Sequence, residues 1–248
     1  MLPTFAVFGV TLSSYGVMCS LGIIVSLIIC LVRCRQARMR MEYAFILFSF
    51  ALAFGLLGAF LTHMVVSYSL KDVFSMIADG TFLKDYSPGF VFYGGLVFGF
   101  AAACLVSRLL HFRLSDYAPR LLPSLPFAHA FGRFGCFLAG CCYGIECGWG
   151  IVYPPFSSAP AYIPLFPVQL LEALLLVLIG VFLLLYAKKG GARIGRAYVV
   201  LYAPTRFMLE FLRGDIHRGI FLHLSTAQWT SLILLILVFL PVKNLRRG

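Results

Sequence analysis

The sequence has little charge for its length. Asp, Glu, Lys and Arg make up 12% of its 248 residues, whereas soluble domains carry about 25%. Hydrophobic residues account for 61% of the chain, and the mean hydropathy is +0.96. These values exclude an ordinary soluble domain and predict an integral membrane protein.

Several other features are missing. The N-terminus has neither the charged region nor the small-residue cleavage site of a signal peptide, so the first apolar segment is expected to stay in the protein. We find no internal repeat, no linker and no low-complexity tract, and no loop between apolar segments is long enough to fold alone. We therefore expect a monomer with a single integral membrane domain over residues 1–248.

Apolar segments of about 17–25 residues can cross a bilayer as helices. The sequence contains seven such segments, which predicts an all-α, polytopic membrane protein with seven transmembrane helices. The expected spans are 14–32, 44–67, 90–107, 121–143, 168–187, 197–213 and 226–241.

The basic residues predict the orientation, because positive residues in short loops stay cytoplasmic. Fourteen of the 20 Lys and Arg residues fall in loops on one face, and only Lys71, Lys84 and Arg218 fall in the opposite loops. The N-terminus is therefore expected outside and the C-terminus in the cytoplasm. This topology, with contact to anionic lipid headgroups, explains the net charge of +11 without a nucleic-acid partner.

Arg133 lies in a segment that otherwise reads as membrane interior. Arginine keeps its charge at any ordinary pH, so its burial in a bilayer is costly and normally marks a paired or ligand-facing site. Four glycines surround it within thirteen residues, at positions 132, 135, 140 and 144. Close backbone approach to a ligand or a neighbouring segment explains them better than a regular lipid-facing helix does.

Further polar residues follow helical spacing in two other spans. One expected stripe in the sixth span, at i, i+4, i+8 and i+11, consists of Tyr202, Arg206, Glu210 and Arg213. In the fifth span, Gln169 and Glu172 share a face. Three arginines against two glutamates leave one surplus positive charge, which favours an anionic ligand such as a lipid phosphate. The alternative is a set of interhelical ion pairs that hold the bundle together.

Two tyrosines are expected in the outer half of the membrane. Tyr15 opens the first span, and Tyr93 opens the third and is followed by Gly94 and Gly95. Both are candidates for contact with a ligand, and the glycines would allow close approach beside the Tyr93 ring. The alternative is that they anchor the chain in the aromatic belt at the interface.

Four cysteines cluster after Arg133, at positions 136, 141, 142 and 147. Their spacing matches no familiar zinc or iron-sulfur pattern, so neither a metal nor a cofactor is predicted. In an oxidising compartment Cys147 could bridge to Cys141 or Cys142. Cys141 is also a possible nucleophile if Arg133 stabilises its thiolate. His129 is interpreted as a core histidine or as a hydrogen-bonding neighbour of Arg133.

Five ordered motifs together resemble the bacterial prolipoprotein diacylglyceryl transferases. They are Tyr15-Gly-Val-Met, Tyr93-Gly-Gly-Leu, Gly132-Arg-Phe-Gly135, Pro167-Val-Gln-Leu-Leu-Glu172 and Arg206-Phe-Met-Leu-Glu-Phe-Leu-Arg213. The resemblance implies the family's seven-span fold in the bacterial cytoplasmic membrane. It also implies the transfer of the diacylglyceryl group of phosphatidylglycerol to the lipobox cysteine of a prolipoprotein, with release of glycerol phosphate.

The resemblance assigns roles to the matching residues. The expected catalytic residues are Arg133, Arg206, Tyr93 and Glu210. The expected substrate-binding residues are Tyr15, Gly94, Gly95, Gly135, Gln169, Glu172, Tyr202 and Arg213.

This chain departs from the family pattern at two places. After Gly-Arg-x-Gly the family usually has Asn-Phe-x-Asn-x-Glu, and here those polar positions are Cys136, Ala139 and Cys141. Tyr93 stands where the family usually has histidine. The alternatives are therefore a phospholipid-dependent transferase with another acceptor, such as a glycan or polyprenyl carrier, a non-catalytic lipid-binding or lipid-transport protein, and a redox-active membrane protein built on the outer cysteines.

Overall fold

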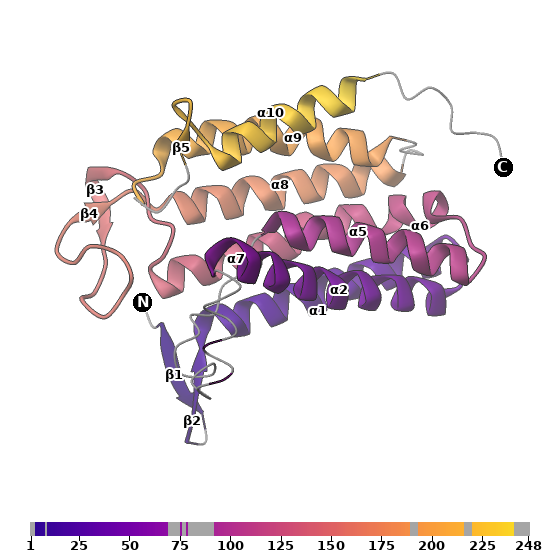
Figure 1. Ribbon diagram of the computed structural model, residues 1–248, viewed down its shortest axis with the longest axis horizontal. Helices are drawn as coiled ribbons and strands as arrows, with labels where there is room; N and C mark the ends of the chain where they lie inside the picture. The colour runs from indigo at the N-terminus through magenta and orange to yellow at the C-terminus, as the bar shows by residue number, and fades with distance from the viewer. Residues whose placement is uncertain are drawn as a thin grey trace. The chain divides into compact units, whose positions relative to one another are not determined.

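A computed structural model describes residues 3–7, 9–68, 75, 78, 92–188, 193–215 and 220–240. The chain is mainly helical (Figure 1). Its contacts divide it into two compact units. The first unit contains Met1–Cys30 and Ala118–Gly248, and the second contains Leu31–Tyr117. The helix α1 (Ser14–Gln36) begins in the first unit and ends in the second.

Three of the described helices are long and apolar enough to cross a membrane. They are α1, α2 (Met41–Ser67) and α8 (Val168–Lys188), and their most apolar windows have mean hydropathies of 2.5, 2.4 and 2.7. Two shorter apolar helices, α5 (Phe92–Leu109) and α10 (Thr226–Phe239), coincide with the third and seventh expected spans. The prediction of a helical membrane protein is confirmed at this level.

The fourth and sixth expected spans have different ends from those predicted. A short helix α6 (Leu114–Leu121) and a 3₁₀ turn η1 (Leu122–Ser124) lead into α7 (Leu125–Ala139). The left-handed Gly140, with φ 74°, ends α7, so Cys141 and Cys142 lie in a loop and not in the span. Likewise α9 (Ile194–Leu209) gives way to a 3₁₀ turn η2 (Glu210–Leu212), and Arg213 follows in extended backbone.

Three short antiparallel strand pairs add to the helices and were not predicted. The first pair, β1 (Thr4–Val7) with β2 (Val10–Ser13), precedes α1 in the register Thr4 to Ser13. The other pairs are β3 (Glu146–Val152) with β4 (Pro164–Leu165), and β5 (Ile220–Phe221) with β6 (Leu224–Ser225).

In the first unit, α8 packs against α7 and α9, and α10 packs against α9 (Figure 1). Apolar residues on α8 and at the start of α9 form one buried cluster around Ile179, Leu183 and Ile194. A second cluster, around Tyr153 and Leu165, fills the segment between α7 and α8. Along the chain, the second cluster lies before Glu172 and the first lies after it.

In the second unit, α2 and α5 approach each other through glycines. A Cβ atom on Gly95 would lie 3.0 Å from the carbonyl oxygen of Gly55, and one on Gly58 would lie 2.7 Å from that of Gly94. Such distances leave no room for a side chain, so the two backbones are in direct contact. The close approach that Gly94 and Gly95 were expected to allow is thus made by a neighbouring helix.

Candidate functional site

Glu172 lies at the centre of a buried polar cluster in the first unit. Its side chain is 3% exposed, and it faces arginines from two neighbouring helices. Arg133 of α7 places Nε 3.1 Å from Glu172 Oε2, and Arg206 of α9 places Nε 4.0 Å from Oε1. One carboxylate on α8 therefore lies between the two guanidinium groups predicted to bind an anion.

Two aromatic side chains orient this carboxylate. The Tyr202 hydroxyl donates a hydrogen bond of 3.2 Å to Glu172 Oε1, and His129 Nε2 lies 3.9 Å from the same oxygen. The rings of His129 and Tyr202 meet edge to face, with centroids 5.4 Å apart. His129 is therefore a neighbour of Glu172, and the arrangement fixes the carboxylate oxygens that face the arginines.

A second carboxylate extends the cluster along α9 and the turn after it. Glu210 Oε2 lies 2.8 Å from Arg206 Nη2 and 3.8 Å from Arg213 Nη1. The helical stripe predicted from Tyr202 to Arg213 is correct as far as Leu209. Beyond it the 3₁₀ turn and extended backbone carry Glu210 and Arg213 off the α-helical path.

Asp215 is a member of the cluster that the sequence analysis missed. Arg213 donates to it through two nitrogens, with Nε 2.9 Å from Oδ1 and Nη2 2.6 Å from Oδ2. The three arginines thus face three carboxylates, and the predicted surplus positive charge is wrong. The spacing Arg-Gly-Asp was the available signal, but Asp215 lies beyond the apolar span in which charges were counted.

The cluster still contains guanidinium donors that the carboxylates do not use. Arg206 is 9% exposed, and its Nη1 is buried with no hydrogen-bond partner among the described residues. Arg133 pairs with Glu172 through Nε, and its side chain is 17% exposed. A buried donor without a partner is costly, so the arrangement favours an acceptor that comes from outside the protein.

Gln169 was predicted to bind substrate, and the structure uses its amide to hold the loop after α7. Its Nε2 donates 2.8 Å to the carbonyl oxygen of Cys141, and the Tyr153 hydroxyl lies 3.3 Å from its Oε1. Gln169 is 1% exposed. It therefore contributes to the site by fixing the backbone of Cys141, a role for which Tyr153 is the unpredicted partner.

Tyr15 lies at the first turn of α1 and is 44% exposed. It borders α7, because a Cβ on Gly135 would lie 3.2 Å from the Tyr15 Cα atom. The Gly135 position is thus explained by contact between α1 and α7. Gly132, in contrast, has nothing within 4 Å of an added Cβ.

Tyr93, Gly94 and Gly95 belong to the second unit. The Tyr93 side chain lies outside the described residues. Its catalytic role stays a prediction, as does a contact of Gly94 and Gly95 with substrate.

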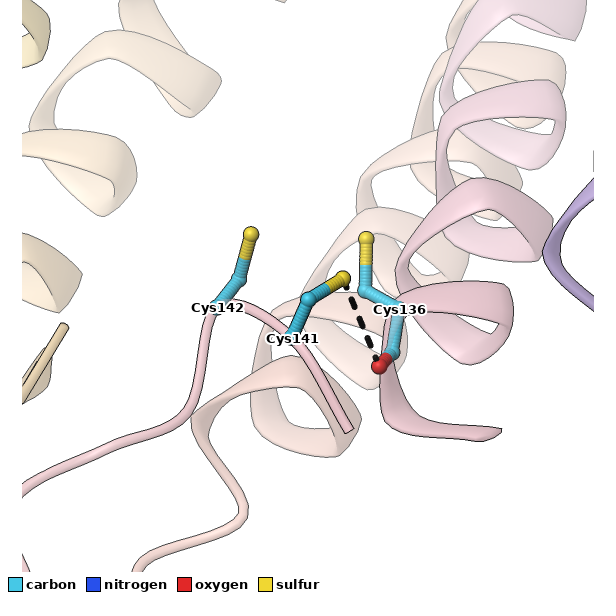
Figure 2. Close-up of side chains that lie close together, drawn as sticks. All are labelled: Cys136, Cys141 and Cys142. Atoms are coloured by element: carbon cyan, nitrogen blue, oxygen red, sulfur yellow. Dashed lines mark hydrogen bonds between the residues drawn. The ribbon is translucent and has the colours of Figure 1, made fainter. Parts of the chain in front are cut away.

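Three of the four clustered cysteines converge where α7 ends. The sulfur atoms of Cys136, Cys141 and Cys142 all lie within 4.8 Å of one another. Figure 2 shows Cys136 on the helix and the other two on the loop that follows, with Cys141 Sγ 3.7 Å from the Cys136 carbonyl oxygen. Cys147 lies in β3 and outside this group.

All eight cysteines are free in the structure, so the bridge from Cys147 to Cys141 or Cys142 that the sequence allows is not formed here. The pKa of Cys142 is lowered, because the thiols of Cys136 and Cys141 hydrogen-bond to its sulfur and because Arg213 and Arg133 lie near enough to stabilise a thiolate. Cys142, rather than Cys141, therefore has the stronger thiolate character.

Sequence comparison places this arrangement in a known family. The profile described as prolipoprotein diacylglyceryl transferase matches residues 3–242. A relative from Clostridium perfringens, named phosphatidylglycerol–prolipoprotein diacylglyceryl transferase 2, is 35% identical over 235 residues, which cover 93% of this chain and 90% of the relative. A transferase of the same name, without the number, from Clostridium tetani is 33% identical over 237 residues, covering 94% and 93%.

A third relative of that name, from Dehalococcoides mccartyi, is 28% identical over 240 residues, which cover 94% of this chain and 89% of the relative. The matches therefore include α7, α8 and α9 and the polar residues that they carry. This chain belongs to the prolipoprotein diacylglyceryl transferase family.

Proposed function

We propose that this protein transfers the diacylglyceryl group of phosphatidylglycerol to the thiol of a prolipoprotein lipobox cysteine and releases glycerol phosphate. The observation that carries the proposal is the pair of buried arginines around Glu172, with Arg206 Nη1 buried and unpartnered among the described residues. The names of the relatives support the choice of donor and acceptor.

The reaction is a displacement at a glyceryl carbon. The acceptor sulfur forms a C–S bond, and the C–O bond to the phosphate breaks. A site for this step has to hold the lipid phosphate and stabilise the negative charge that grows on the leaving oxygen. Arg133 and Arg206 carry donors suited to both tasks, since guanidinium groups bind phosphate oxygens through paired N–H donors.

The carboxylates give the arginines a fixed direction. Glu172 holds Nε of Arg133 and receives the Tyr202 hydroxyl, and Glu210 holds Nη2 of Arg206. Arg206 is thereby anchored through Nη2 while its Nη1 remains for the phosphate. Arg213 pairs with Asp215 and also lies near Glu210. In this proposal it therefore holds Glu210 and the loop in place, and it binds the lipid phosphate less than Arg133 and Arg206 do.

The protein is a multi-pass protein of the bacterial cytoplasmic membrane in this proposal, with seven spans, the N-terminus outside and the C-terminus in the cytoplasm. The apolar helices support the membrane location, and the basic loops support the orientation. In this topology the end of α7 and the loop after it face the outer side, where a secreted prolipoprotein presents its cysteine. We propose that it acts as a monomer. Reporter fusions to the two termini test the topology, and reporters active on the same side would contradict it.

The activity is tested with purified full-length protein in nanodiscs that contain phosphatidylglycerol labelled in the acyl chains and in the headgroup. A lipobox peptide should gain the labelled diacylglyceryl group as a thioether, and an equal amount of labelled glycerol phosphate should appear. The matched peptide with serine in place of cysteine should remain unmodified. If phosphatidylglycerol is bound but neither product forms, the protein is a lipid-binding member of the family and the proposal fails.

A further inference from the structure

The three converging thiols have the geometry of a metal site. A tetrahedral zinc ion with Zn–S bonds of about 2.3 Å places its sulfur ligands about 3.8 Å apart. The sulfurs of Cys136, Cys141 and Cys142 already lie within 4.8 Å of one another (Figure 2). Small side-chain rotations are enough to bring them onto one ion.

The loop that carries two of these cysteines is held by the rest of the fold. Gly140 and Cys142 adopt left-handed backbone, with φ 74° and 57°, which turns the chain back toward Cys136. The conformation is uncommon for a residue with a side chain and is typically retained where the surroundings enforce it. Gln169 fixes the Cys141 carbonyl at 2.8 Å.

Backbone hydrogen bonds secure the residues just after this turn. The Gly144 amide donates 3.0 Å to the carbonyl of Phe166, and the Gly214 amide donates 3.0 Å to that of Tyr143. These hydrogen bonds therefore join the loop that carries Cys141 and Cys142 to the segment that carries Arg213. Three ligands held in place in this way lower the cost of assembling a metal centre.

We propose that Cys136, Cys141 and Cys142 bind one Zn²⁺ through three thiolates and leave its fourth position for the thiol of the acceptor cysteine. Structural zinc sites use four protein ligands, whereas catalytic sites use three and keep one position open. Within the described ranges, no fourth Cys, His, Asp or Glu joins the group. The inference rests on the proposed transferase function and names how its acceptor is activated.

The charges near the group suit such a centre. Zinc with three thiolates carries a formal charge of −1, and an added acceptor thiolate makes it −2. Arg213 lies on a neighbouring segment, because the backbone hydrogen bond from the Gly214 amide to the Tyr143 carbonyl joins that segment to the residue after Cys142. Because Arg133 and Cys136 are three residues apart on α7, they share a helix face, which brings the metal-bound thiol toward the arginine that holds the phosphate.

The chemical step balances without an oxidant or reductant. The acceptor thiol loses its proton on binding Zn²⁺, which makes a thiolate available at neutral pH. Its sulfur attacks the glyceryl carbon, the C–O bond breaks, and the electron pair leaves on the phosphate oxygen. The proton lost by the thiol leaves with the glycerol phosphate, and the neutral thioether, a weak ligand, dissociates from the metal.

The first test is the metal content of the full-length protein purified without chelator, measured by inductively coupled plasma mass spectrometry. We expect about one zinc per chain, since three thiolates and a borderline-soft divalent ion match in preference. The Ser variants of Cys136, Cys141 and Cys142 should each retain less than a tenth of it. Cys147→Ser is the matched control and should retain all of it. Zinc that survives in the three variants, or copper in place of zinc, overturns the proposal.

The second test replaces zinc by Co²⁺, whose thiolate charge-transfer absorption reports its ligands. Adding the lipobox peptide should increase this absorption, and the serine peptide should not change it. An unchanged spectrum with the cysteine peptide overturns the open position. Phosphatidylglycerol retention by each variant, measured by mass spectrometry, shows that it has folded, and Cys142→His should restore zinc binding because imidazole is also a zinc ligand.

The outcomes separate this proposal from the transferase function. Removing zinc with a chelator should lower the transfer rate by more than about 100-fold, which is more than the loss of a residue that only orients a metal ligand typically causes. Added Zn²⁺ should restore the rate. Full transfer by zinc-free protein overturns the metal proposal while the function stands. A peptide-dependent cobalt spectrum without any thioether product supports the metal proposal while the function fails.

Discussion

The polar centre of the first unit and the α2–α5 contact of the second unit bury different kinds of group. Glu172, Arg206 and Glu210 are buried among helices that are otherwise apolar. At the α2–α5 contact the buried groups are backbone, brought together by Gly58, Gly94 and other glycines. The first unit thus buries charged side chains that pair with one another, and the α2–α5 contact buries backbone that packs closely.

The glycines of this chain lie in two kinds of surroundings. Those of α2 and α5 leave no space for a side chain, whereas Gly132, next to Arg133, has open space around it. A glycine near a polar residue is therefore no sign of a ligand by itself. The stronger sign of a site is a buried donor without a protein partner, and Arg206 Nη1 is such a donor among the described residues.

The largest effect on stability is expected at Glu172. Glu172→Gln removes the charge that lies between Arg133 and Arg206 and leaves both arginines with less compensation. Breaking a buried ion pair from one side costs about 3–5 kcal/mol of unfolding free energy. Glu42→Gln is the control, because its pair with Arg40 is exposed at 69% and 67% of the two side chains, and surface pairs contribute about 0–1 kcal/mol.

Denaturant titration in a mild detergent gives the unfolding curve of each variant, and from it the free energy of unfolding. Similar losses for Glu172→Gln and Glu42→Gln would show that the polar centre is not an electrostatic unit. That result would remove the distinction between the two regions.

The next largest effect is on activity, at the two arginines that face Glu172. Arg133→Gln and Arg206→Gln should each lower kcat of diacylglyceryl transfer by about 10²–10³, as the loss of one preorganised donor to a developing oxyanion does. Arg196→Gln is the matched control, since Arg196 is also on α9 but lies over the ring of Phe239 and outside the cluster. Equal rates for Arg206→Gln and Arg196→Gln would contradict the role given to Arg206.

A smaller effect is expected at the glycine contact. A Cβ on Gly58 would lie 2.7 Å from the carbonyl oxygen of Gly94, so Gly58→Ala should destabilise the protein by about 1–3 kcal/mol through overpacking. Gly132→Ala meets nothing within 4 Å and should gain up to about 1 kcal/mol from helix propensity. The thermal unfolding midpoints of the two variants should move in opposite directions. A fall of equal size in both would mean that contact distance does not set the cost.

The smallest effect is expected at an uncharged buried pair. Ser26 Oγ donates 2.8 Å to Ser124 Oγ, which itself donates 2.7 Å to the carbonyl of Leu121. Ser26→Ala leaves the second bond in place and should cost about 0.5–1.5 kcal/mol, near the average of about 0.6 kcal/mol for hydrogen bonds within membranes. A loss as large as that of Glu172→Gln in the same unfolding assay would contradict the special status of charge in the first unit.

The helices and the charged residues were predictable because each prediction needed only local sequence. Apolar length located α1, α2 and α8, and an arginine in apolar sequence marked Arg133. The pairing of Arg133 with Glu172 and Arg206 was not predictable in detail, because it depends on how three helices pack. Asp215 was missed because helical spacing ceases to apply after Leu209, where the backbone leaves the α-helix.

The cysteines show the same limit more sharply. Linear spacing suggested a bridge from Cys147, since the four thiols are close in sequence. The left-handed turn at Gly140 and Cys142 instead returns the chain to Cys136, while Cys147 continues into β3. The positive φ angles of these two residues therefore determine which thiols lie close together. No pattern of residue types predicts a positive φ at a cysteine.

The proposed function requires the buried arginines to bind the phosphate of the donor lipid. Quantitative mass spectrometry of the lipids that copurify with the protein tests it most directly. The wild type and Arg196→Gln should retain phosphatidylglycerol in preference to neutral or zwitterionic lipids, and the double variant Arg133→Gln with Arg206→Gln should lose that preference. Equal phosphatidylglycerol retention by the double variant and the wild type would contradict the account.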